Sequence, residues 1–236
     1  MWNDRQKVLK LAKEFVNICE KNNIWYIADN GTLLGAIRNN KIIPWDDDFD
    51  VSMTIHSFKK LKKLFPERII DTNEKGHPLL IPKFLVSRML YLSSVVFVDI
   101  FLIVPSNDKN IKKFTSFRNK TRFAMQCVHS KWNNFNIGTK ILWLITLWVK
   151  CISKKMSYEE AISILEVPKK QAMYFYTIDN SIDPIKMNKQ KILSLKRDKI
   201  KFEDFEIYIP IEYKNILINK YGKNYMIPKK YEIFKK

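Results

Sequence analysis

The spacing of hydrophobic and polar positions in the first part of the chain predicts alternating helices and strands. Residues 3–21 carry apolar side chains at helical spacing with lysine and glutamate opposite them, which predicts an amphipathic helix. Residues 25–28 form a short apolar run that predicts a strand, and residues 32–38 predict a helix after the Asn-Gly pair that ends this strand. Residues 49–53 alternate as a strand does. The chain therefore begins in the order helix, strand, helix, strand.

The rest of the chain continues this mixture and ends with a strand and a helix. The further predicted elements are a helix from Ser57 to Leu64, two neighbouring strands at 84–92 and 95–104, a basic and mostly helical stretch at 107–153, a helix at 158–167, a strand at 202–209 ending at Pro210, and a helix at 211–220 that Gly222 stops. This order predicts an α+β fold with a mixed β-sheet core, flanking helices and a helical insertion. We expect a core at 1–106, a mainly helical region at 107–200 that faces the acceptor or a membrane, and a C-terminal part at 201–236 that packs back on the core.

Composition places the chain among globular proteins and gives it a strong positive charge. Hydrophobic residues make up 46% of the 236 residues and charged residues 28%, which favours a folded core over disorder. The net charge of +18 attracts polyanions such as an anionic membrane, a phosphorylated substrate or nucleic acid. A compositional bias towards lysine on solvated faces explains the same charge without any ligand. No nucleic-acid-binding motif of the usual kinds is present, so we expect no nucleic-acid partner.

Cysteine usage and the apolar segments favour a cytoplasmic protein. Cys19, Cys127 and Cys151 are odd in number and widely spaced, which predicts neither a zinc site nor a disulfide framework. Residues 1–14 are charged throughout and do not form a signal peptide. Residues 141–152 are too few to span a bilayer and predict a buried helix; the alternative is a helix in the interface at the inner face of the cell membrane.

Four of the five residues 46–50 are aspartates, and their surroundings point to a metal site. In a strand, Asp48 and Asp50 project from the same face because side chains alternate with period two. Paired carboxylates offer oxygen ligands of the kind that Mg²⁺ or Mn²⁺ prefers. An isolated acidic run is more often a surface turn. Here the run lies between Trp45 and an apolar strand, which favours the metal site.

Candidate groups outside the aspartate run add to this site. Asp99 lies inside an apolar strand, where a charge needs a partner or a metal, so it is a candidate third ligand or a base. Gly31 and Thr32 precede a predicted helix, and backbone N–H groups there can bind a phosphate oxygen. Arg38 is a candidate phosphate clamp, or else a surface arginine of the same helix.

The longest of these motifs resembles a known family. Residues 30–38 (NGTLLGAIR) followed by 43–51 (IPWDDDFDV) closely resemble the signature of the LicD family, to which the fukutin-type proteins are related. The similarity continues in residues 18–22 before an aromatic strand, in 98–101 (VDIF), in 202–210 and in 221–228. It covers both ends of the chain, whereas residues 107–200 agree only in their helical character.

The resemblance implies a nucleotidyltransferase-like fold and a metal-dependent phosphotransferase. LicD-like proteins typically move a phospho-alcohol such as phosphocholine from its CDP-activated form to a sugar of a cell-surface glycan, of the teichoic acid, lipopolysaccharide or capsule type, and release CMP. Carried onto this chain, the resemblance implies metal ligands at Asp48, Asp50 and Asp99 and a phosphate-facing turn at Gly31 and Thr32. It implies a loop-shaping or substrate-contacting role for Asp46 and Asp47, with Asp46 as a possible base. Trp45 and Arg38 are the further candidate substrate contacts.

Two other functions are compatible with parts of the sequence. A true nucleotidyltransferase would use the same carboxylates, but its acceptor would attack the α-phosphorus of a nucleoside triphosphate and release diphosphate. A non-enzymatic basic protein could bind nucleic acid or membrane through its charge, although this leaves the aspartates unexplained. The expected partners are a CDP-alcohol, with CDP-choline first, and a glycan or lipid-linked glycan acceptor. Choline, ethanolamine, ribitol and glycerol all stay open as the transferred alcohol.

Overall fold

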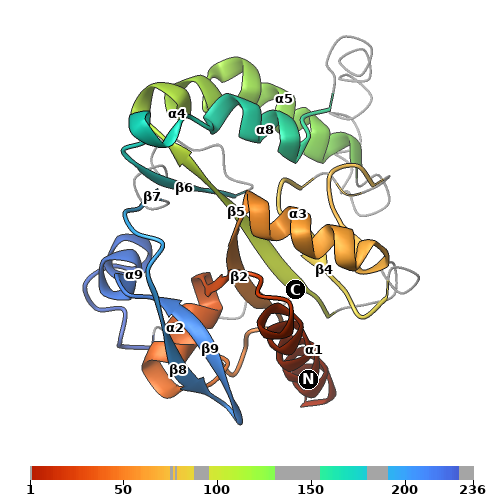
Figure 1. Ribbon diagram of the computed structural model, residues 1–236, viewed down its shortest axis with the longest axis vertical. Helices are drawn as coiled ribbons and strands as arrows, with labels where there is room; N and C mark the ends of the chain where they lie inside the picture. The colour runs from red at the N-terminus through yellow and green to blue at the C-terminus, as the bar shows by residue number, and fades with distance from the viewer. Residues whose placement is uncertain are drawn as a thin grey trace.

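The structure is a computed structural model, which describes residues 2–74, 77, 79–87, 96–130, 155–179 and 191–228 (Figure 1). Within these residues, seven strands form one mixed sheet in the order β1-β2-β5-β4-β3, with β6 pairing with β5 and β7 pairing with β6. These strands are β1 (Ile27–Ala28), β2 (Phe49–Thr54), β3 (Ile69–Ile70), β4 (Lys83–Phe84), β5 (Val98–Ser106), β6 (Tyr174–Ile178) and β7 (Lys191–Ile192). The fold is therefore α+β with a nucleotidyltransferase-like mixed sheet, as the sequence predicts.

The two central strands of the sheet, β2 and β5, run parallel and are almost entirely buried. The sequence of β5 is a near-continuous apolar run, which is the pattern of a strand covered on both faces, whereas β2 alternates apolar residues with Asp50, Ser52 and Thr54. All other pairs in the sheet are antiparallel. The parallel register aligns Asp50 of β2 with Asp99 of β5, so the only acids of these two strands are direct neighbours.

Helices cover the sheet and close its core. The amphipathic helix α1 (Trp2–Lys21) buries its apolar stripe, and Phe15 makes edge-to-face contacts with Tyr26 and Phe84. The other helices are α2 (Asn30–Asn39), α3 (Ile55–Leu64), α4 (Asp108–Phe114), α5 (Phe117–Ser130), α8 (Tyr158–Leu165) and α9 (Tyr213–Tyr221), with short 3₁₀ turns at Pro66–Arg68 and Lys169–Gln171. In Figure 1, α4, α5 and α8 gather at one end of β5, while α2 and α9 lie at the lower left, beside the hairpin of the C-terminal part.

The C-terminal part forms a separate hairpin of β8 (Arg197–Phe202) and β9 (Phe205–Pro210), followed by α9. The hairpin packs on the edge of the sheet at β1, where Tyr208 meets the ring of Tyr26. The expected strand at 202–209 was wrong in one respect, because it is divided by a turn in which Glu203 has a φ of 52°. Its first residue, Phe202, ends β8.

Two helix starts differ from the prediction for a common reason, which is a capping side chain upstream. The helix expected from residue 32 begins at Asn30, since Asp29 is its N-cap. The helix expected from Ser57 begins at Ile55, since Thr54 Oγ1 accepts from the Ser57 N–H. Gly31 and Thr32 therefore lie inside the first turn of α2 and do not precede it.

The region expected to be mainly helical contains α4, α5 and α8, but it also contains strands that sequence reasoning missed. These are β6, β7 and the start of β8, and β6 extends the core sheet by pairing with residues 102–106 of β5. The expected helix at 141–152 and most of the expected strand at 84–92 lie outside the described residues. No helix in the described ranges combines the length and the apolarity needed to cross a bilayer.

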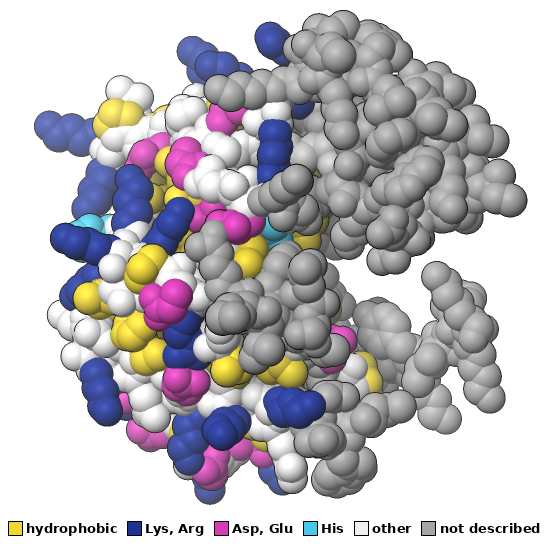
Figure 2. Space-filling model, turned by 90° about the vertical axis from the view of Figure 1, so that its right-hand side faces the viewer, with side chains coloured by type: hydrophobic (Ala, Val, Ile, Leu, Met, Phe, Trp, Pro, Cys, Tyr) yellow, Lys and Arg dark blue, Asp and Glu magenta, His cyan; other side chains and the backbone are white. Residues whose placement is uncertain are grey.

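Charges of both signs occur on the surface. Figure 2 shows one face, on which lysine and arginine side chains occur together with aspartates and glutamates over the described part. Several described lysines and arginines are ion-paired, including Arg5, Arg68 and Arg122 with Glu203, Glu14 and Glu160. Cys19 is a free, buried thiol in α1.

Candidate active site: a carboxylate cluster between two central strands

The parallel pairing of β2 with β5 assembles the three predicted metal ligands. Asp50 and Asp99 are register partners, and Asp48 lies two residues before Asp50 on the loop that enters β2. One carboxylate oxygen from each of Asp48, Asp50 and Asp99 lies within 4.8 Å of the others. The predicted convergence of these carboxylates is thus present in the fold.

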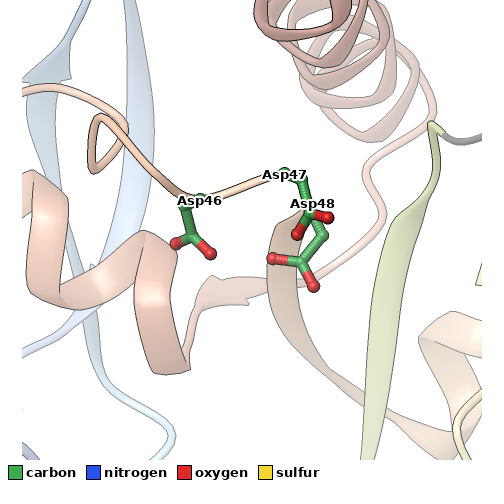
Figure 3. Close-up of side chains that lie close together, drawn as sticks. All are labelled: Asp46, Asp47 and Asp48. Atoms are coloured by element: carbon green, nitrogen blue, oxygen red, sulfur yellow. The ribbon is translucent and has the colours of Figure 1, made fainter. Parts of the chain in front are cut away.

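The loop before β2 carries a second, overlapping group of acids. Asp46, Asp47 and Asp48 also offer oxygens within 4.8 Å of one another. Figure 3 shows the three side chains along this loop, with Asp46 nearest to α2 and all carboxylates directed to the same side of the loop. Asp48 belongs to both groups, so it links the loop acids to the strand acids. In the part of the chain that the structure describes, these are the two places where such acids cluster closely enough to hold a cation.

The first turn of α2 is bound directly to Asp50. The Gly31 N–H donates to Asp50 Oδ2 at 3.1 Å, and the Asp50 N–H donates to Thr32 Oγ1 at 2.7 Å. A helix N-terminus carries partial positive charge, so this contact stabilises the carboxylate. Gly31 also leaves room for Asp46, because a Cβ atom at this position would lie too close to Asp46 Oδ2 and the carboxylate would have to move. The predicted turn therefore positions two of the acids.

Burial and mutual repulsion raise the pKa values of the clustered acids. Burial, followed by repulsion from Asp46 and Asp99, raises the pKa of Asp48 to about 7. Burial and then the charge of Asp48 raise the pKa of Asp50 well above its usual value. The pKa of Asp46 is also raised, by burial and then by the charge of Asp47. The folded protein therefore holds these carboxylates in a place that disfavours their charge.

Lys83 compensates part of this charge, and sequence reasoning missed it. Lys83 of β4 is the antiparallel register partner of Asp99, and its ammonium donates to Asp99 Oδ1 at 2.6 Å. The ammonium also lies 3.1 Å from the centroid of the Phe97 ring. Burial raises the pKa of Asp99, and Lys83 opposes that rise. The signal available in the sequence was a single lysine inside the apolar run 79–85.

Asp29 and Lys220 form a second missed pair on the other side of the site. Asp29 is 2% exposed, and its carboxylate accepts from Ser52 Oγ at 2.8 Å and from the Asn30 N–H at 2.7 Å. The ammonium of Lys220 in α9 donates to Asp29 and to Asn30 Oδ1. A buried carboxylate needs such a partner. An acid directly before Asn-Gly was a capping signal that the sequence offered.

The remaining predicted residues lie around the cluster or away from it. Trp45 is 55% exposed on the loop beside Asp46, and Asp47 is exposed as well. Arg38 lies in the last turn of α2, about 10 Å along the helix axis from Gly31 at 1.5 Å per residue. Among the described residues, the structure gives no ion pair between Arg38 and these carboxylates, and its role as a phosphate clamp stays a prediction.

The donor set suits a hard divalent cation. Asp48, Asp50 and Asp99 offer oxygen ligands only, which is the preference of Mg²⁺ and Mn²⁺. The three carboxylates face a single ammonium, that of Lys83, among the described contacts of this group. A cation would relieve the repulsion that raises their pKa values. The residues present therefore fit such an ion.

The mixed sheet and the acids on its two central strands define a protein of the nucleotidyltransferase-like class. Within it, residues 23–131 match the family model described as LicD/FKTN/FKRP, nucleotidyltransferase domain. The resemblance to the LicD family is thereby confirmed for residues 23–131, which are just under half of the chain. The matched range includes every predicted site residue and Lys83, but not Lys220.

Curated relatives match short segments of the chain. The protein named lipopolysaccharide cholinephosphotransferase LicD from Haemophilus influenzae is 49% identical over 45 residues, which are 19% of this chain and 17% of that protein. Uncharacterised proteins from Rickettsia prowazekii and Rickettsia typhi are 40% and 38% identical over 58 residues, which are 25% of this chain and 22% and 19% of those proteins. The matches thus span about a fifth of the relatives' lengths.

Proposed function

We propose that this protein is a phosphotransferase that moves a phospho-alcohol from a CDP-alcohol to a sugar hydroxyl of a cell-surface glycan. The observation that carries the proposal is the convergence of Asp48, Asp50 and Asp99 beside the N-terminus of α2, within a LicD-type domain. The proposed cofactor is Mg²⁺ or Mn²⁺, bound by these three carboxylates. When bound, the cation would neutralise the donor diphosphate and stabilise the phosphate that leaves.

The reaction that we propose is a single displacement at the phosphorus that bears the alcohol. The acceptor hydroxyl oxygen forms a bond to that phosphorus, the bridging bond to the cytidylate phosphate breaks, and CMP leaves with the electron pair. The hydroxyl proton passes to a base. Asp46 is our candidate, because it is partly buried against Gly31 and burial raises its pKa, which makes its carboxylate a better proton acceptor.

Choline is the alcohol that we propose first. A relative that shares a short segment is named a lipopolysaccharide cholinephosphotransferase. Trp45 offers an exposed indole beside the exposed carboxylate of Asp47, and an aromatic face next to negative charge suits a quaternary ammonium. Replacing Trp45 by alanine should raise the KM for CDP-choline more than the KM for CDP-glycerol, whose alcohol is uncharged.

The test is a direct assay of CMP release. The purified protein is incubated with Mg²⁺ and CDP-choline, CDP-ethanolamine, CDP-ribitol or CDP-glycerol, with and without glycan acceptors. We expect acceptor-dependent CMP release that EDTA abolishes, and a loss of at least a thousandfold for Asp50→Asn with the fold intact. Asp198→Asn, which changes an exposed acid on β8, is the matched control and should keep full activity. Near-normal turnover by Asp50→Asn would contradict the proposed mechanism.

A nucleotidyltransferase reaction is the second candidate, because the matched domain is described by that name. In this reaction the acceptor attacks the α-phosphorus of a nucleoside triphosphate, and diphosphate leaves. The same carboxylates would serve, so the product distinguishes the two candidates. Release of diphosphate from CTP, without CMP release from any CDP-alcohol, would replace the first proposal by the second.

A further inference from the structure

A lysine that follows the matched domain in the sequence contacts the first turn of α2. Lys220 lies in the last turn of α9, and its ammonium donates to the carboxylate of Asp29 and, at 2.9 Å, to Asn30 Oδ1. Asp29 and Asn30 directly precede Gly31, whose N–H binds Asp50. The ammonium thus binds the two residues next to the N–H group that holds the carboxylate of Asp50. Helix α9 packs against α2 along this contact (Figure 1).

Two features of the turn depend on this ammonium. Asp29 is buried at 2% exposure, and Lys220 is the cation paired with it. Asn30 has a φ of 41°, in the left-handed region that asparagine adopts more readily than most residues because its side chain can form local hydrogen bonds. Lys220 binds that side chain. It therefore holds both the cap and the unusual first residue of α2.

The same residues connect to the strand that carries the metal ligands. The Asp29 N–H donates to the Asp50 carbonyl at 3.1 Å, and Ser52 Oγ donates to Asp29 Oδ2 at 2.8 Å. A change at Asp29 would thus alter both the first turn of α2 and the position of this turn relative to β2. Small displacements of such groups have large effects on transfer reactions, which need aligned reacting atoms.

We propose that Lys220 is a positioning residue that fixes the first turn of α2, and with it Asp50, through Asp29 and Asn30, so that α9 completes the donor site. This inference rests on the proposed function for the identity of the donor. It assigns to residues 213–221, which lie outside the matched domain, a role in donor binding. Lys220 itself acts through Asp29 and Asn30.

The first experiment measures donor kinetics in variants of the full chain. Lys220→Met should lower kcat/KM for the CDP-alcohol at least tenfold, with the KM for the glycan acceptor unchanged. Lys220→Arg should recover most of the activity, since a guanidinium can still donate to both oxygens. Lys214→Met, on an exposed position of the same helix, is the control and should behave as wild type. Wild-type donor kinetics in a folded Lys220→Met protein would overturn the inference.

The double variant Asp29→Asn with Lys220→Met separates positioning from stability. It leaves no buried charge unpaired, and the asparagine that replaces Asp29 can still cap α2, so the melting temperature should return close to the wild-type value. A positioning role predicts that donor kcat/KM stays at least tenfold low in this folded protein. Recovery of activity together with stability would reduce Lys220 to a structural counter-ion and overturn the inference.

Binding of CDP, measured by calorimetry, distinguishes failure of this inference from failure of the proposed function. The expected CDP affinity of the double variant is at least tenfold weaker than that of the wild type. If the wild type binds CDP but transfers no phospho-alcohol, the proposed reaction fails, and weaker binding by the variant still supports the positioning role. Equal CDP affinity in both proteins overturns the inference, and a wild type that binds no CDP overturns both.

Discussion

Replacing Asp48 by asparagine should stabilise the metal-free protein and remove its response to a divalent cation. Burial and the charges of Asp46 and Asp99 raise the pKa of Asp48 from 3.8 to about 7 in the folded state. The folded protein therefore binds more protons than the unfolded chain between these values. Stability contributed by protonated Asp48 is complete below pH 3.8 and is lost as the pH rises through 7.

The magnitude follows from this rise in pKa. Compared with a side chain that stays neutral, a difference of this size lowers the free energy of unfolding by about 4 kcal/mol at pH 8. At pH 5, where Asp48 is mostly protonated in the folded state, it lowers this free energy by about 2 kcal/mol. Partial exposure of Asp48 screens its charge, so we expect roughly half of these values. For a chain of this size, about 2 kcal/mol raises the melting temperature by about 4–8 °C. Asp48→Asn should therefore melt higher than wild type in EDTA at pH 8, and the difference should shrink at pH 5.

Addition of Mg²⁺ should reverse the comparison. At a concentration of a hundred times its Kd, a bound cation stabilises the wild type by about 2.7 kcal/mol. If the loss of one carboxylate weakens binding a hundredfold, the same concentration stabilises Asp48→Asn by only about 0.4 kcal/mol. Thermal melts in EDTA and in Mg²⁺, with Asp198→Asn as the exposed-acid control, measure both effects. A variant that melts below wild type in EDTA at pH 8, or that gains as much from Mg²⁺, would refute this reasoning.

Three other substitutions test the packing around the site. Gly31→Ala should keep or raise stability, because alanine favours helix by about 1 kcal/mol and only the tip of the Asp46 side chain must move; CMP release should fall at least tenfold as Asp46 is displaced. Gly35→Ala should lose about 2 kcal/mol in urea unfolding, because the new Cβ meets the Lys41 carbonyl, which is backbone and cannot swing away. Burial lowers the pKa of His77 from 6.5 to about 4, so the unfolded chain takes up its proton first. As the pH falls from 7.5 to 5, the free energy of unfolding of the wild type should decrease by about 2 kcal/mol more than that of His77→Gln. Equal decreases in the two proteins would contradict this.

The cluster of Asp48, Asp50 and Asp99 could be predicted because its signal is local. Strand alternation predicted one face for Asp48 and Asp50, although Asp48 lies on the loop before β2, and Asp99 stands out as a charge inside an apolar run. Hydrophobic patterning also gave most elements of the described core. Pairing of β2 with β5 was required to bring Asp99 to the other two, and the sequence motif alone left that pairing as an assumption.

The counter-ions could not be predicted in the same way. Lys83 and Asp99 are 16 residues apart, and Lys220 and Asp29 are 191 apart, so their pairing is set by tertiary packing. In a chain with 42 lysines and arginines, no composition signal distinguishes these two. The hairpin turn at Glu203 was missed because it lacks the glycine or asparagine that usually marks a positive φ.

Strand β6 was missed for a different reason. Its sequence, Tyr-Phe-Tyr-Thr-Ile, is rich in aromatic and β-branched residues, which favour strands. The surrounding basic, helical pattern of 107–167 was extended over it, although the local composition had changed. Five residues give a weak signal on their own, and pairing with the C-terminal half of β5 is what decides their structure.

The position of the acids explains how the fold tolerates them. The hydrogen bonds between β2 and β5 fix Asp50 beside Asp99, so that these two like charges are held together in spite of their repulsion. Apolar residues on both strands bury the surroundings and supply the stability that the repulsion removes. The N–H of Gly31 in α2 stabilises the carboxylate of Asp50, and the ammonium of Lys83 in β4 stabilises that of Asp99. A charged group held in this way need not reorganise when a cation or a diphosphate binds, and that preorganisation is the main source of electrostatic catalysis.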